Sequence, residues 1–175
     1  KKIGKVAKLA AVIATGIEGT IGISHTRWAT HGGVTDENAH PHISNQSNVA
    51  IVHNGIIENF RELRAELSKD GVEFVTDTDT ETVVLLTQKY MAEGLGPVDA
   101  ATKTIARLHG AFALAFLFDG EDDLMIGARK GAPLAVGYGD NEMYLGSDAI
   151  ALSPMTDRVT YLEEGDRAVL TRTSV

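Results

Sequence analysis

The sequence predicts a single α+β domain in which two β-sheets lie between helices on the outside. The first observation is that residues 111–118 are apolar at every position. Such a strand cannot expose either face to water, so we expect it in the centre of a sheet that is covered on both sides. The second observation is that shorter apolar stretches follow it, separated by turn residues. The third is that the helical segments before residue 108 carry one apolar stripe each, which suits helices packed outside a sheet.

The length and composition fit one domain spanning residues 1–175, which can bury roughly 70% of its unfolded surface. The net charge is −8 and no basic cluster is present, so we expect no nucleic acid and no anionic membrane as partners. No apolar run reaches the ~20 residues of a membrane helix, and the first residues do not read as a signal peptide. The absence of cysteine excludes disulfides, thiolate metal ligands and a thiol nucleophile within these residues. We expect a cytoplasmic protein.

The first third of the chain predicts a helix, two strands and a loop. Residues 1–14 carry apolar side chains at helical spacing. Ile17–Ala29 should contain the first strand, and residues 31–47, rich in Gly, Asn, Ser and Pro, should form a loop. Asn48–His53 predicts an interior strand, so that His53-Asn54-Gly55 lies where this strand ends.

A first capping pattern marks the helix that follows. Asn59 can cap the helix N-terminus, with Glu62 three residues later as its capping-box partner. The apolar stripe of this helix consists of Phe60, Leu63 and Leu67. Gly71 predicts its end, and Val72–Val75 predicts a short strand.

A second capping pattern, Thr78 with Glu81, predicts the next helix, and Pro97 predicts the start of a third. The expected buried side chains are Val83, Leu86 and Tyr90 in the first of these, and Val98, Ala101, Ile105 and Leu108 in the second. The shorter strands after residue 118 are expected at 124–128, 134–138, 143–145, 159–162 and 168–170.

The segment between residues 21 and 55 is the densest in chemically active groups. It holds five of the six histidines and the only tryptophan. His40 and His42 could chelate a metal, with His25, His31 or His53 as further ligands. The sequence has no HExxH pattern, and histidines also act as hydrogen-bonding residues in packed loops, so both interpretations stay open.

Three further positions suggest ligand contacts. Arg27, directly after an apolar run, suits either a ligand carboxylate or an internal ion pair. Asn54 and the backbone N–H of Gly55 could stabilise an oxyanion, although Asn-Gly is also a common hairpin turn. The helix expected after it argues against a simple hairpin. Asp79 would lie in the first turn of a helix, where it either complements the helix dipole or binds an ammonium group.

Taken together, these residues resemble a known family. The motifs HTRWATHG at 25–32, NAHPH at 38–42, HNGIIEN at 53–59 and TDTE at 78–81 are similar to the glutaminase domain of the glutamine–fructose-6-phosphate aminotransferase (isomerising) family. Further fragments agree over nearly the whole chain. The resemblance implies an N-terminal-nucleophile hydrolase fold, a four-layer αββα sandwich of two antiparallel sheets flanked by helices.

The resemblance also implies a role for each matching residue. Arg27 and Thr30 would hold the α-carboxylate of L-glutamine, Asp79 and the Gly55 backbone its α-ammonium, and Asn54 with the Gly55 N–H would form the oxyanion hole. Trp28 would gate an ammonia path to a sugar isomerase domain. His31 and His40 complete the expected substrate-binding set. No cofactor and no metal are implied, and the full-length enzyme is expected to be a homo-oligomer.

One departure from the family is clear. The family begins with a cysteine whose thiol attacks glutamine and whose α-amino group acts as base. This chain has no cysteine, and it is expected to begin some tens of residues into the family's domain, without its first strands. It is also expected to stop where the isomerase domain starts. We therefore expect the isolated chain to be inactive, with a silent glutamine-binding module and a metal-dependent hydrolase as alternatives.

Overall fold

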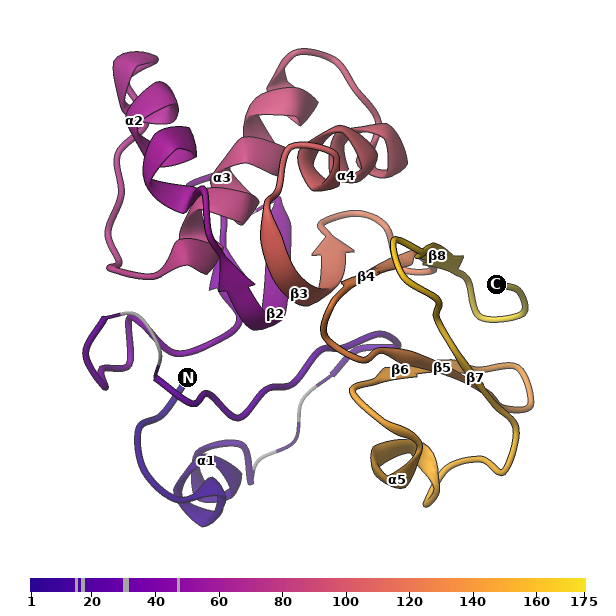
Figure 1. Ribbon diagram of the computed structural model, residues 1–175. Coiled ribbons are helices and arrows are strands. Elements are labelled where there is room, and N and C mark those ends of the chain that lie inside the picture. The colour runs from indigo at the N-terminus through magenta and orange to yellow at the C-terminus, as the bar shows by residue number, and fades with distance from the viewer. Residues whose placement is uncertain (15, 17, 30–31, 47) are drawn as a thin grey trace.

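The computed structural model describes residues 1–14, 16, 18–29, 32–46 and 48–175 (Figure 1). Two antiparallel sheets organise the fold. The larger sheet has the order β1 (His42–Ile43), β2 (Val49–Ile57), β3 (Gly110–Phe118), β4 (Met125–Lys130), β8 (Arg167–Leu170). The smaller sheet has the order β6 (Met143–Gly146), β5 (Ala135–Tyr138), β7 (Val159–Tyr161).

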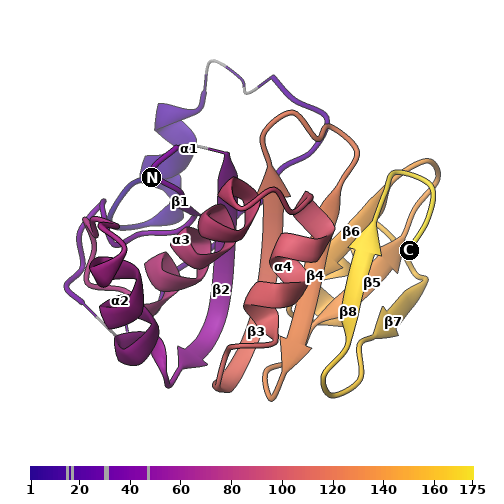
Figure 2. The same ribbon diagram turned by 90° about the horizontal axis from the view of Figure 1, so that it is seen from above.

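The helices lie outside these sheets, as the sequence predicts. Three helices, α2 (Phe60–Lys69), α3 (Asp79–Ala92) and α4 (Pro97–Ile105), cover one face of the larger sheet (Figure 2). The short helix α5 (Ala149–Leu152) packs on β5 and β6. Helix α1 (Val6–Val12) lies near the N-terminus and buries no residue. The expected α+β arrangement of two antiparallel sheets with helices is confirmed.

The core consists of two clusters. The main cluster lies between the larger sheet and helices α2, α3 and α4, and includes Phe112, Phe116 and Leu86. The second cluster joins the two sheets and is centred on Val136 of β5 and Leu170 of β8. The larger sheet therefore has a helical layer on one face and, over β4 and β8, the smaller sheet on the other.

The all-apolar strand is central, as expected, since β3 pairs with β2 on one side and β4 on the other. Strand β2 is longer than predicted, because it stays in register with β3 as far as Ile57 opposite Gly110. His53, Asn54 and Gly55 therefore lie inside the strand pair, and the expectation that they follow the strand end was wrong.

Three predicted segments differ in the structure. The described part of the expected first strand, residues 18–29, is in no strand, because it has no ladder partner among the described residues. It nevertheless keeps alternating exposure from residue 21 to 28. Val72–Val75 is not a strand, because the N–H groups of Val75 and Thr76 donate to the Glu81 carboxylate, each at 2.8 Å. Conversely, the predicted loop contains β1, which pairs with residues 50 and 51.

The helix starts are at the predicted places, but only one expected cap forms. Thr78 caps α3 by accepting the Glu81 N–H. Asn59 precedes α2 without a side-chain cap bond. Its side chain instead bonds the connection between α4 and β3, through the Arg107 carbonyl at 2.8 Å and the His109 N–H at 2.9 Å.

The predicted buried faces are only partly correct. Helix α3 is buried on nearly all sides rather than along one stripe. In α4 the buried residues are Ala100, Ala101 and Thr104, whereas Val98 is 38% exposed. Small side chains fit this face because α4 packs closely against α3, where Thr104 and Thr87 share a hydrogen bond of 3.0 Å.

Candidate functional site

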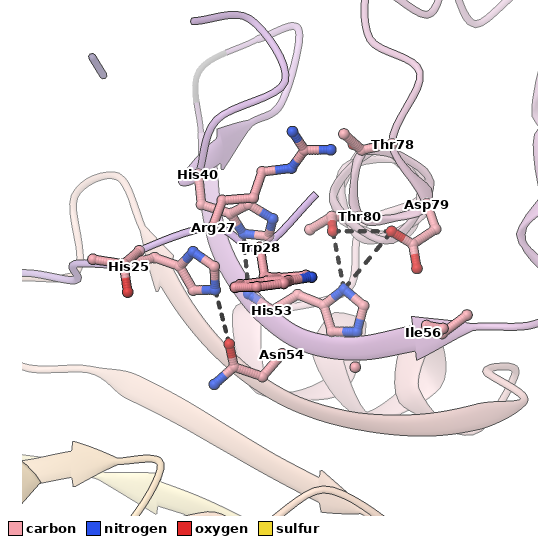
Figure 3. Close-up of a pocket in the computed structure, with 12 residues that line it drawn as sticks. His25, Arg27, Trp28, His40, His53, Asn54, Ile56, Thr78, Asp79 and Thr80 are labelled. Atoms are coloured by element: carbon pink, nitrogen blue, oxygen red, sulfur yellow. Dashed lines mark hydrogen bonds and ion pairs between the residues drawn. The ribbon is translucent and has the colours of Figure 1, made fainter. Parts of the chain in front are cut away.

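A pocket of about 290 Å³ opens where three separate segments meet (Figure 3). These are the extended segment 25–28, the middle of β2, and the first turn of α3, with His40 beside them. The lining residues are His25, Thr26, Arg27, Trp28, His40, His53, Asn54, Gly55, Ile56, Thr78, Asp79 and Thr80. Six predicted site residues line this pocket together: Arg27, Trp28, His40, Asn54, Gly55 and Asp79. Thr30 and His31 lie outside the described residues.

Asp79 ties the start of α3 to strand β2. Its side chain is 6% exposed, and its Oδ2 accepts the N–H of Ile57 at 2.8 Å. Its other oxygen accepts the Thr80 hydroxyl at 3.4 Å and lies 3.9 Å from His53 Nδ1. The carboxylate also lies in the first turn of α3, where the helix dipole favours a negative charge. A buried carboxylate held this way is a fixed acceptor for a cationic ligand group.

Arg27 and Trp28 form the outer part of the pocket. The Arg27 guanidinium is half-buried and donates from Nη1 to the Gly33 carbonyl at 2.9 Å. The two parallel N–H donors of a guanidinium fit the two oxygens of a carboxylate better than they fit the one oxygen of a carbonyl. Trp28 is 88% exposed although it lines the pocket, so its indole forms a wall that faces solvent.

Gly55 lets the two central strands approach closely. Its φ is +114°, a conformation that residues with a side chain rarely adopt. A Cβ at this position would lie 2.1 Å from the Ala111 carbonyl oxygen. The neighbouring Asn54 side chain is exposed, and its Oδ1 lies 2.8 Å from His25 Nε2. An amide and a close-lying glycine backbone therefore stand side by side in β2 at the pocket.

Four histidines cluster at the pocket: His25, His40 and His53 line it, and His42 lies beside His40. The rings of His25 and His40 stack with centroids 4.2 Å apart, and His42 meets His40 edge-on at 4.8 Å. His40 Nδ1 accepts the backbone N–H of His53 at 3.2 Å. Burial, with smaller contributions from neighbouring positive charges, lowers the pKa of His40 to about 2 and that of His42 to about 3. These two rings are therefore neutral at neutral pH.

The histidines do not form a metal site in the described part of the chain. Among those residues no group of three or more His, Cys, Asp or Glu side chains is placed to hold a metal ion. His40 and His42 meet through their ring systems, and His42 Nε2 lies 3.2 Å from the Thr78 hydroxyl. These contacts are those of a packed hydrogen-bonding cluster. Nor is any described helix long and apolar enough to cross a membrane.

Two features of the site were missed from the sequence. Thr80 bridges His53, at 2.9 Å from its Nδ1, and Asp79. Glu81 is 2% exposed and its carboxylate accepts two backbone N–H groups and the Thr76 hydroxyl, all at 2.8 Å. The capping pattern at 78–81 could have drawn attention to Glu81, but it assigned the carboxylate to the helix N-terminus instead of the preceding loop.

Comparisons with known proteins agree on one family. Residues 13–172 match the family model described as "Glutamine amidotransferase domain". A glutamine–fructose-6-phosphate aminotransferase (isomerizing) of Bradyrhizobium diazoefficiens is 63% identical over 158 residues, which cover 90% of this chain and 26% of that protein. The protein of the same name from Zymomonas mobilis is 56% identical over 173 residues, which cover 98% of this chain and 28% of that protein. The chain thus spans about a quarter of the length of these curated relatives.

Solved structures show the same fold. The glutamine phosphoribosylpyrophosphate amidotransferase of B. subtilis, complexed with ADP and GMP, is 27% identical with a TM-score of 0.67. The match covers 84% of this chain and 32% of that one. A predicted glutamine amidotransferase from Pseudomonas aeruginosa, at 11% identity and a TM-score of 0.52, is similar in fold alone and covers 78% of this chain and 64% of that one.

Proposed function

Because the chain belongs to the family of glutamine amidotransferase domains, we propose that its pocket binds L-glutamine as the glutaminase part of a longer enzyme. The ammonia released would convert fructose 6-phosphate to glucosamine 6-phosphate. The names of relatives that are 56% and 63% identical support this choice. The observation that carries the proposal is the pocket itself, where a guanidinium, a buried carboxylate and an amide pair meet.

The two charged groups suit the two ends of an amino acid. Arg27 would bind the α-carboxylate by exchanging its contact with the Gly33 carbonyl for a bidentate pair. Asp79, already held by the Ile57 N–H, would bind the α-ammonium together with the backbone of Gly55. The volume of about 290 Å³ lies at the lower end of the range for small-molecule pockets, roughly 300–1,000 Å³, which suits one amino acid. Thr30, His31 and His40 remain proposed contacts.

The amide pair suits the chemical step. Attack on the side-chain amide of glutamine creates a tetrahedral oxyanion, which Asn54 Nδ2 and the Gly55 N–H would stabilise. The thiol for this attack must come from outside these residues, because they contain no cysteine. We therefore predict that the 175-residue chain binds glutamine but releases no ammonia from it. A coupled ammonia assay that detects sustained release by the purified chain would contradict this.

The rest of the enzyme is also part of the proposal. The relatives are about three and a half times as long as this chain and are named isomerizing. We propose that a sugar isomerase domain in the same polypeptide receives the ammonia, that Trp28 gates its path, and that the full-length enzyme is a homo-oligomer. The exposure of Trp28 at the pocket wall supports the gating role, since an exposed ring is free to move.

Calorimetric titration of the chain with L-glutamine tests the binding site. Arg27→Ala and Asp79→Asn should each weaken binding by about 2–5 kcal/mol, roughly 30- to 5,000-fold, because each leaves a charged ligand group without its partner. The matched controls are Arg167→Ala and Asp99→Asn, which remove the same charges at exposed positions outside the pocket. These controls should bind as the wild-type chain does.

The outcomes separate the candidate functions. Failure of the wild-type chain to bind L-glutamine would overturn the proposal. Wild-type affinity in the Arg27 or Asp79 variant would remove that residue from the site. Binding without ammonia release, even by a longer protein that supplies an N-terminal cysteine, would favour the silent glutamine-binding module, which the lack of cysteine in this chain makes the second candidate.

A further inference from the structure

We propose that His25 is a positioning residue that holds the side-chain amide of Asn54 in the orientation that glutamine hydrolysis requires. The inference rests on the proposed function, because it assigns His25 a task only if Asn54 stabilises an oxyanion. His25 does not touch the reacting atoms in this scheme. It determines which end of the Asn54 amide remains available to them.

The contact itself defines the orientation. His25 Nε2 lies 2.8 Å from Asn54 Oδ1 (Figure 3). A carbonyl oxygen can only accept a hydrogen bond, so Nε2 must carry the proton and donate it. The other end of the amide, the NH₂ group, has no hydrogen bond to any described residue. It is left as a donor at an exposed position of β2 in the pocket.

The reverse orientation would be unsuitable for an oxyanion. If His25 carried its proton on Nδ1 instead, Nε2 would accept from the Asn54 NH₂ group. The carbonyl oxygen would then be the free end, and its lone pairs would repel a developing negative charge. Removing one donor from an oxyanion hole costs ~10²–10³ in kcat. The proton position on one histidine therefore decides whether Asn54 can act.

A closed chain of contacts fixes the His25 ring. It stacks on His40 at a centroid distance of 4.2 Å and an interplanar angle of 21°. His40 is held in turn by the backbone N–H of His53, which donates to its Nδ1 at 3.2 Å. His53 and Asn54 are neighbours in β2. The contacts thus run from the His53 backbone through the His40 and His25 rings to the Asn54 side chain.

The electrostatic surroundings keep a single proton on the ring. Burial is the largest influence and lowers the pKa of His25; the contacts with the Asn54 side chain and the His53 backbone oppose it, and the Arg27 guanidinium adds a smaller lowering. His25 is therefore neutral at neutral pH and carries one proton. With that proton on Nε2, the Asn54 oxygen has a permanent donor.

Nuclear magnetic resonance on the ¹⁵N-labelled chain tests the orientation directly. A long-range ¹H–¹⁵N spectrum should show His25 as the Nε2–H tautomer, with a proton that exchanges slowly with water. The exposed His109 is the internal control and should show no protected ring proton. An Nδ1–H tautomer at His25 would overturn the inference, because the amide would then face the other way.

Two variants test the consequence for the ligand. L-Glutamine should shift the Asn54 side-chain NH₂ signals in the wild-type chain and in His25→Gln, whose amide can still donate to the Asn54 oxygen. In His25→Phe, which keeps a stacking ring but has no donor, these shifts should be lost while the backbone signals of Arg27 and Asp79 still respond. Full NH₂ shifts in His25→Phe would refute the positioning role. If Arg27 and Asp79 do not respond in the wild-type chain, the proposed function fails, and the tautomer still decides how Asn54 is held.

Discussion

Gly55→Ala should destabilise the fold through a backbone clash between β2 and β3. Gly55 lies opposite Phe112 in the central strand pair, with a φ of +114°. An added Cβ would lie 2.1 Å from the Ala111 carbonyl oxygen, 2.9 Å from its carbon and 3.0 Å from Phe112 Cα. All three atoms belong to the backbone of β3, so no side-chain rotation can relieve the contact. One of the two strands must shift.

Two contributions add up in the expected loss of stability. A left-handed backbone costs a residue with a Cβ about 1–2 kcal/mol. Forcing an extra carbon into a close-packed interior costs about 1–3 kcal/mol more. The free energy of unfolding should therefore fall by about 2–5 kcal/mol, a large share of the ~5–15 kcal/mol typical of native proteins. Urea unfolding followed by circular dichroism measures it. Trp28 fluorescence is a poor probe, because this ring is 88% exposed in the folded chain.

Gly71→Ala separates the two contributions. Gly71 also has a positive φ, +81°, but an added Cβ would meet nothing within 4 Å. This variant should lose only the conformational part, about 1–2 kcal/mol. If Gly55→Ala is destabilised no more than Gly71→Ala, the argument from close strand approach is wrong.

Two further predictions concern the buried polar groups. Acidification from pH 7 to 5 should destabilise the chain, because the folded-state pKa values of His40 and His42, about 2 and about 3, lie below the ~6.5 of an unfolded histidine. The unfolded chain then takes up protons first, and each histidine lowers the free energy of unfolding by up to about 1.4 kcal/mol per pH unit as the pH falls below ~6.5. In His42→Gln the urea midpoint should therefore depend less steeply on pH, and the same dependence as in the wild-type chain would contradict this. Glu81→Gln should lower the free energy of unfolding by about 1–3 kcal/mol. In the wild-type chain each carboxylate oxygen accepts a backbone N–H, and in the variant one of these N–H groups would face the glutamine NH₂ group and lose its acceptor. Hydrogen exchange at Thr76 should accelerate, whereas the exposed control Glu121→Gln should change neither quantity.

The strands after residue 110 could be predicted within one or two residues because their signal is local. An apolar run such as 111–118 is stable only in the interior, as a strand that is covered on both faces, whatever its neighbours are. Turn residues at Gly139 and Gly165 then delimit the neighbouring strands. The same holds for the start of α4 at Pro97, which is set by covalent geometry.

The segments that were predicted wrongly depend on partners far away in sequence. Val72–Val75 has the composition of a strand, but the N–H groups of Val75 and of the next residue, Thr76, bond to the buried Glu81 carboxylate on α3 instead of to another strand. Residues 21–28 alternate in exposure as a strand does, yet a strand also needs a neighbour, and no described residue provides one. β2 runs past its apolar stretch because β3 offers nine residues in register. Composition sets what a segment can do, and the available partner decides what it does.

The site follows the same rule at the level of single groups. Arg27 and Asn54 could be nominated from the sequence because each follows an apolar run, where a charge or an amide is costly unless it has a partner, and Asp79 because it was expected in the first turn of a helix. His25 and His40 could not be assigned to one role from the sequence, because histidine suits a metal, a proton transfer and a hydrogen bond equally well. In the structure their rings stack at 4.2 Å and His25 lies 2.8 Å from the Asn54 side chain, and these contacts are what the proposed hydrogen-bonding role of His25 rests on. A charged side chain is costly to bury without a partner, so its role can be suggested from the sequence. The role of a histidine, which can serve in several ways, can be assigned only from its contacts in the structure.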